Sequence, residues 1–238
     1  MARPKVYDEH LAHRLISDAA ATLAAGGVEA LSLRPLAAGA GTSTSAIYAM
    51  FGDKAGLVSA VVNQARAGFL QAQRECPTTD DPLADLTALG HAYRQWALAH
   101  PSLYAVMFGG RALAEGSEPA VPIEPTEPTE PVEPVEPVEP VADDALSAAG
   151  QAAADLMGDE TISVLAGLVQ ALVDAGLLRG DVVTITLSIW AGVHGLVSLE
   201  ITGAWPVRGA AARALYEQHL AAIRRAWQPQ AASGSASA

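Results

Sequence analysis

A short run of hydroxyl side chains offers the clearest binding chemistry in the sequence. Ser43, Thr44, Ser45 and Tyr48 lie within TSTSAIYAMFGDK, and Lys54 closes the run with a positive charge. Hydroxyls and the free N–H groups at a helix start donate hydrogen bonds to phosphate oxygens. Small neutral side chains also let a helix approach bases closely. The run therefore indicates a DNA surface held mainly by neutral donors, with a well-capped surface helix as the alternative.

The elements around this run have the order of a helix-turn-helix. Ser43 is placed to cap a two-turn helix over residues 44–51, which must be held by packing through Ile47 and Phe51. Ser32 can cap the preceding helix over residues 33–40, and Gly41 separates the two. In this motif the second helix enters the major groove of DNA. The candidate DNA contacts are Ser32, Ser43, Thr44, Ser45, Tyr48 and Lys54, with Arg3 and Lys5 as a minor-groove arm or simply a disordered terminus.

The acidic balance of the chain comes from one segment. Residues 115–144 hold ten acids and no base, and without them the 26 acids fall to 16, against 14 bases. Residues 1–60 carry five charges of each sign. A nucleic-acid partner is therefore not excluded by the net charge of −12.

Catalytic and metal-binding patterns are weak. Cys76 is the single cysteine, and neither a nucleophile–base set nor a phosphate-binding loop is present. His10 and His13 are three residues apart beside Asp8 and Glu9, a spacing that a metal could use but that is more often a solvated helix face. We expect a non-enzymatic protein without a cofactor or a metal.

Helical periodicity covers most of the chain and predicts an all-α fold. Apolar stripes or caps indicate helices over residues 8–25, 54–76, 83–100, 143–157, 159–175, 181–202 and 210–227, with a short apolar element at 103–108. The helix over 181–202 is apolar nearly all round, so we expect it to be buried on most faces. Asp181, His194 and Glu200 argue against a membrane span. We expect a soluble, cytoplasmic protein whose tail, residues 229–238, is disordered.

A Glu-Pro repeat interrupts the second half of the chain. EPTEPTEPVEPVEPVEPV forbids both helix and strand, and its natural conformer is polyproline II. We expect the insert at residues 115–142 to loop into solvent and to be poorly ordered. A partner-binding motif, or a mimic of DNA, is the alternative interpretation.

The segment RLISDAAATLAAGGVEALSLRPLAAGAGTSTSAIYAMFGDKAGL resembles the DNA-binding domain of TetR family regulators, over about residues 12–60. HPSLYAVMFGG and IWAGVHGLVSLEITG resemble the ligand-binding domain of a TetR subgroup with a Trp/His/Gly signature, here Trp190, His194 and Gly195. Two features depart from the family pattern: Thr42 in the turn, and the Glu-Pro insert.

The resemblance implies a dimeric, all-helical repressor that a small molecule releases from its operator. Tyr48 and Lys54 would touch phosphates, Thr44 and Ser45 would lie near bases, and the last two long helices would form a four-helix dimer interface. The implied domains are a helix-turn-helix at 1–60, a linking helix to about 76, and a ligand-binding and dimerisation domain at 77–228.

Large side chains are scarce in the second domain, so they are the candidates for an effector site. The expected ligand-binding residues are Trp96, Tyr104, Met107, Trp190 and His194. The alternative for each is a core or dimer contact, and for His194 a buried ring satisfied by a neighbouring carbonyl. The leading hypothesis is a repressor that binds a palindromic operator as a homodimer. Its rival is a small-molecule sensor of the same fold that acts through a protein partner.

Overall fold

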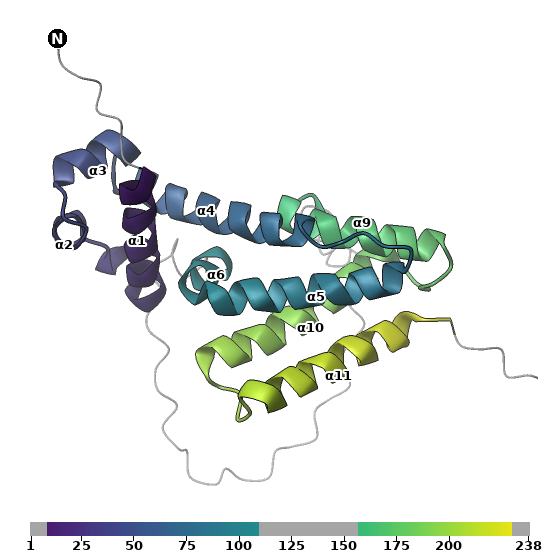
Figure 1. Cartoon of the computed structure of the whole chain (residues 1–238). Helices are drawn as coiled ribbons and strands as arrows, with labels where there is room; N and C mark the ends of the chain where they lie inside the picture. Colours follow the sequence, from purple (N-terminus) through teal and green to yellow (C-terminus); the bar gives the residue numbers. More distant parts are fainter. Residues whose placement is uncertain (1–8, 110–156, 230–238) are drawn as a thin grey trace, which may run out of the picture.

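The computed structural model describes residues 9–109 and 157–229, which form helices and no strand (Figure 1). Arg3, Lys5, the Glu-Pro insert, most of the helix expected over 143–157, and residues 230–238 of the tail lie outside these ranges. The helices are α1 (Glu9–Ala30), α2 (Leu33–Gly39), α3 (Thr44–Phe51), α4 (Lys54–Arg74), α5 (Pro82–Ala99), α6 (Pro101–Phe108), α9 (Glu160–Asp174), α10 (Val182–Thr202) and α11 (Gly209–Trp227). The all-α prediction is confirmed.

The helix-turn-helix unit at one end of the molecule has its own core. Leu15, Ala19 and Leu23 of α1 meet Ile47 of α3 and Leu57 of α4, all almost fully buried. The expected stop of α1 at Gly26 and Gly27 is present as a break, since both glycines leave the helical conformation and Gly27 has a φ of 67°. One further turn then carries the chain to Ala30 and on to α2.

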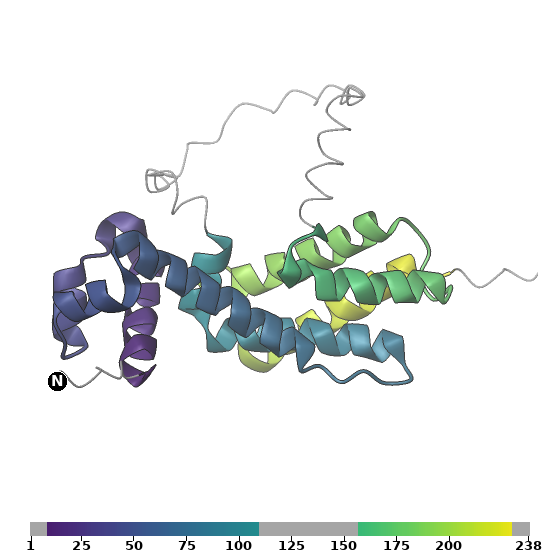
Figure 2. The ribbon, with the colours of Figure 1, turned by 90° about the horizontal axis from the view of Figure 1, so that it is seen from above.

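The second unit is a bundle in which α4 and α5 pack beside α9, α10 and α11 (Figure 2). A bidentate ion pair joins α5 to α10, with Arg94 Nε 2.8 Å and Nη2 2.6 Å from the two carboxylate oxygens of Glu200. Tyr216 of α11 donates a hydrogen bond of 2.6 Å to the carbonyl of Gly90 in α5. These polar links fix the crossing of three helices around an apolar interior.

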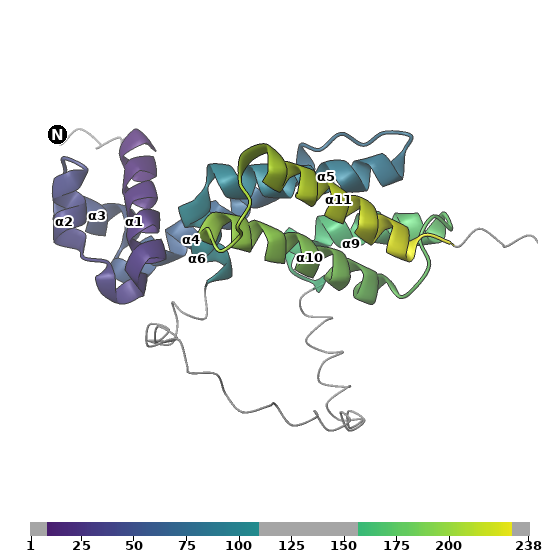
Figure 3. The same cartoon turned by 90° about the horizontal axis from the view of Figure 1, so that it is seen from below.

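The expectation that α10 is buried on most faces is wrong for the single chain. Of its most apolar 18-residue stretch, 28% is buried. One side of α10 packs against α5, α9 and α11, and the other side is uncovered, with Leu199 44% exposed. By length and composition α10 could cross a membrane. Figure 3 shows α10 and α11 side by side on an outer face, with no other described helix in front of them.

Candidate DNA interface and effector cavity

The start of α3 presents hydroxyl groups to solvent. Ser43 caps the helix, accepting a hydrogen bond of 3.2 Å from the backbone N–H of Ala46, and its own O–H remains able to donate. Ser45 is exposed, Thr44 is half-buried, and the Tyr48 side chain is 53% exposed. The Tyr48 ring therefore lies on the solvent side of α3, where it can contact another molecule.

The opposite face of α3 fixes its orientation. Ile47 has no exposed surface, and Phe51 packs against the same core. Gly52 then turns the chain with a φ of 81°, and Asp53 caps α4 through a hydrogen bond of 2.7 Å to the N–H of Gly56. A Cβ on Gly56 would lie 1.9 Å from the carbonyl oxygen of Phe51, so the corner between α3 and α4 has no room for a side chain.

The remaining predicted contacts flank α3. Ser32 stands at the N-cap of α2, but its exposed side chain makes no capping hydrogen bond. That hydroxyl is therefore available to a phosphate. Lys54 is half-buried as the first residue of α4. Ser32 precedes α2 and Lys54 follows the end of α3, so they add one neutral donor and one ammonium group to the hydroxyls at the start of α3.

A histidine–tyrosine cluster joins α5, α6 and α10. The Nδ1 of His194 lies 2.9 Å from the hydroxyls of both Tyr93 and Tyr104, which are 3.3 Å from each other. The Tyr104 hydroxyl also lies 3.0 Å from Ser198 Oγ. Burial lowers the pKa of His194, so the ring is neutral at neutral pH and hydrogen-bonds to the tyrosine hydroxyls through Nδ1.

Aromatic rings enclose this polar cluster. Trp190 stacks on His194 with ring centroids 5.2 Å apart, and the Phe108 ring meets His194 edge-on at 4.6 Å. Trp96 packs against Phe69 at 5.2 Å, and Met107 is half-buried against the same apolar cluster. The five residues expected to bind an effector therefore belong to one packed region, where His194 is satisfied by tyrosine hydroxyls.

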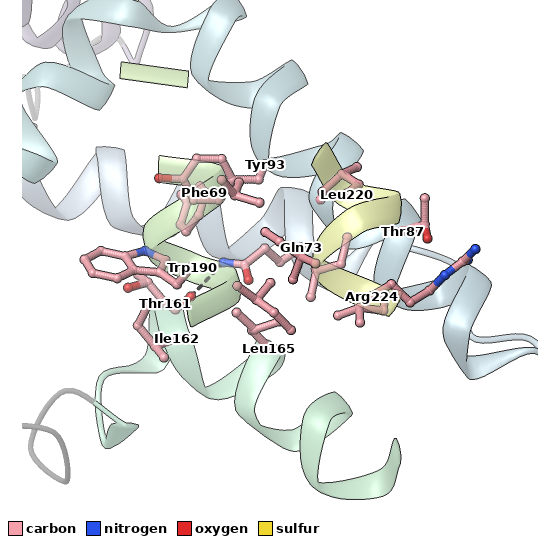
Figure 4. A pocket seen from close by; sticks show the side chains of 16 residues that line it. Phe69, Gln73, Thr87, Tyr93, Thr161, Ile162, Leu165, Trp190, Leu220 and Arg224 are labelled. Atoms are coloured by element: carbon pink, nitrogen blue, oxygen red, sulfur yellow. Dashed lines mark hydrogen bonds between the residues drawn. The ribbon is translucent and has the colours of Figure 1, made fainter. Parts of the chain in front are cut away.

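A cavity of about 40 Å³ lies beside this cluster, between α4, α5, α9, α10 and α11 (Figure 4). At this volume it has room for about three water molecules. Of the five expected ligand residues, Trp190 alone is among its lining. Leu165, Ile189 and Val193 form apolar walls, while Gln73 donates a hydrogen bond of 3.0 Å to the carbonyl of Thr161 across α4 and α9.

Two polar residues that line this cavity, Gln73 and Arg224, are absent from the predicted site. A signal for both was present. Buried side chains recur every four residues along α4 at 57, 61, 65 and 69, and along α11 at 212, 216 and 220. Gln73 and Arg224 occupy the next position of each stripe, and both line the cavity. A polar side chain in phase with a buried stripe is a candidate binding residue.

The histidine pair on α1 gains no metal-site support. Among the described residues, no three His, Cys, Asp or Glu side chains lie close enough together to hold a metal ion. His13 is exposed on its helix. Asp8 of this cluster lies outside the described residues, so the solvated helix face and the metal site both stay predictions from the sequence.

Two family models match the chain. Residues 15–61 match bacterial regulatory proteins of the tetR family, and residues 86–223 match the tetracyclin repressor-like C-terminal domain. No curated protein matches the chain.

Solved structures share the fold over nearly the whole chain. A protein of unknown function from Rhodococcus is 24% identical, with a TM-score of 0.60 over 95% of this chain and 100% of its own. The TetR family transcriptional regulator PfmR from Thermus thermophilus is 19% identical, with a TM-score of 0.60 over 89% and 97%. A second Rhodococcus protein, a bacterial regulatory protein in the tetR family, is 17% identical, with a TM-score of 0.62 over 92% and 97%.

Proposed function

The chain belongs to the TetR family of DNA-binding regulators, which are not enzymes, and from this premise we propose that it is a ligand-responsive transcriptional repressor. It binds a palindromic operator as a homodimer in the cytoplasm. A small-molecule effector in the C-terminal bundle releases it, because the effector binds more tightly to a conformation that does not fit the operator.

The observation that carries this proposal is the double role of α6. Val106, 2% exposed, belongs to the core of the helix-turn-helix unit, and the half-buried Leu103 packs beside it. Tyr104, in the same two turns, hydrogen-bonds to His194 in the bundle. A shift of α6 relative to the bundle therefore displaces the DNA-binding unit, because one short helix is packed into both cores.

A second connection runs through α4. Arg66 of α4 forms an ion pair of 2.5 Å with Asp159, which caps α9, and Gln73 of α4 bonds to Thr161 on the same helix. Both links lie at the end of α9 that borders the cavity. An effector that pushes α9 away from α4 must break or rearrange them, and α4 carries this change to α3 through the tight corner at Gly56.

The uncovered face of α10 and α11 supports the homodimer. Leu199 of α10 is 44% exposed and Leu215 of α11 is 39% exposed. Pairing this face with its copy would bury both side chains in a four-helix interface. Light scattering after gel filtration tests it: wild type should elute at twice the chain mass, and Leu199→Asp with Leu215→Asp should elute as a monomer.

DNA recognition is tested by fluorescence anisotropy on DNA from the region upstream of the protein's own gene, with scrambled DNA alongside. Wild type should prefer the upstream DNA, and its affinity should fall only gently with salt, because few counterions are released by neutral donors. Tyr48→Ala should abolish the preference, whereas Leu98→Ala, an exposed residue of α5 (37%), should keep it.

Equal and weak binding to both DNAs would contradict an operator in that region. If genomic DNA fragments then failed as well, a sensor of this fold that acts through a protein partner would replace the repressor. The neutral hydroxyl face of α3 is the feature of the structure that such a partner would meet.

A further inference from the structure

The cavity beside Trp190 is lined by apolar side chains and by a single charged one, which is positive. Its walls are largely aliphatic and aromatic, and its neutral polar side chains are Gln73, Thr87, Tyr93 and Thr161. Arg224 is the charged member of the lining, and no acid accompanies it there. An apolar chamber with a single cation selects against cationic ligands and favours an anion attached to an apolar body.

Among the described residues, the Arg224 side chain also has no ion-pair or hydrogen-bond partner. No ion pair joins its guanidinium to a carboxylate there, and its Nε is a buried donor with no acceptor. The guanidinium is always protonated, and its fork matches two oxygens of a carboxylate. Arg224 is half-buried, and its buried Nε–H at the cavity wall is a donor that an oxygen of a bound anion would satisfy.

A second unused donor lies elsewhere in the same cavity. The indole Nε1–H of Trp190 is buried and has no acceptor among the described residues. In Figure 4, Trp190 and Phe69 lie at one side of the pocket and Arg224 with Thr87 at the other, with Leu165 and Gln73 between them. The lining in this view therefore runs from an aromatic end to a cationic end, with aliphatic and polar side chains between them.

We propose that the effector is an elongated organic acid whose carboxylate pairs with Arg224 and whose apolar body extends toward Trp190. The inference rests on the proposed function for the role of this ligand as an effector. It adds the chemical class, which follows from the charge and the unused donors of the cavity.

The present volume requires the cavity to open on binding. About 40 Å³ is far below the roughly 300–1,000 Å³ of pockets that enclose small organic ligands. The hydrogen bond from Gln73 to Thr161 borders the space and joins α4 to α9. An aliphatic chain that separates these helices would break this bond, so binding of the acid and displacement of α4 are the same event.

The test uses a matched set of probes and the full-length protein. Hexanoate, octanoate and decanoate are compared with octanamide and octylamine by calorimetry and by tryptophan fluorescence, without DNA. We expect at least one carboxylate to bind about tenfold or more tightly than octanamide, since a hydrogen bond to a charged group contributes that much. Octylamine should not bind.

Two arginine variants separate a specific contact from general charge. Arg224→Gln should remove the preference for carboxylate over amide, whereas Arg225→Gln, its exposed neighbour, should retain it. Circular dichroism tests whether each variant is folded. Retained binding of octanamide is a second check that Arg224→Gln is folded.

The proposal is overturned if no carboxylate of the series binds, if octanamide or octylamine binds as tightly, or if Arg224→Gln leaves the preference unchanged. The role as effector fails separately. A carboxylate that binds through Arg224 but leaves the protein–DNA complex intact supports the ligand class and contradicts release by that ligand.

Discussion

Val106→Ala is the sharpest perturbation of the link between the two units. Val106 is 2% exposed in the helix-turn-helix core, although its helix also contacts the bundle. Truncation removes two methyl groups, at about 0.8 kcal/mol each for transfer from water, and leaves part of their volume empty. We therefore expect the free energy of unfolding to fall by about 2 kcal/mol.

Val169→Ala is the matched control, since Val169 has no exposed surface and lies on α9 within the bundle core. Urea unfolding should show similar losses for both variants. Hydrogen exchange measured by mass spectrometry should then separate them. Val106→Ala should speed the exchange of amides in α1, whereas Val169→Ala should leave them unchanged. Equal exchange in α1 for the two variants would refute the placement of α6 in both cores.

Three further predictions concern the corner, the cap and the buried histidine. Gly56→Ala places a Cβ 1.9 Å from a backbone carbonyl oxygen at the end of α3. We therefore expect a lower temperature of thermal unfolding, and a loss of DNA binding measured by anisotropy. Gly167→Ala, a helical position with nothing near its Cβ, should instead stabilise by up to about 1 kcal/mol; a gain for both would contradict the tight corner. Ser43→Ala removes the cap of α3 and should cost about 1 kcal/mol in urea unfolding, and no change would mean that the cap is not formed in solution. Burial lowers the pKa of His194 below its ordinary 6.5, so the unfolded chain takes up the proton first as the pH falls. The free energy of unfolding should be full above about pH 6.5 and should fall on acidification, less steeply in His194→Gln than in wild type. An equally steep fall in the two proteins would contradict the burial of this ring.

The helices could be predicted closely because their signals are local. Ser43 caps α3 as predicted, and Gly41, which separates α2 from α3, takes a positive φ in the turn. Apolar spacing likewise gave the buried stripe of α1. Caps, turn glycines and apolar periodicity depend on residues that are neighbours in the sequence, so a single sequence is enough to identify them.

The candidate effector site could be predicted less well because it depends on which helices meet. Tyr104 and His194 come together across α6 and α10, but the cavity beside them is also lined by Gln73 and Arg224 from α4 and α11. No local pattern in the sequence indicates that α6 packs into the core of the helix-turn-helix unit and also into that of the bundle. The burial of α10 was overestimated for the same reason: an all-apolar helix fits an intermolecular face as well as an interior.

Selection of DNA by the purified protein tests the central claim most directly. Fragmented genomic DNA from the source organism is incubated with wild type or with Tyr48→Ala, and the captured fragments are sequenced. A DNA-binding repressor of this fold predicts that wild type enriches a few fragments sharing a palindromic site and that Tyr48→Ala does not. Uniform recovery of the genome by wild type would contradict sequence-specific binding, and with it the proposed repressor.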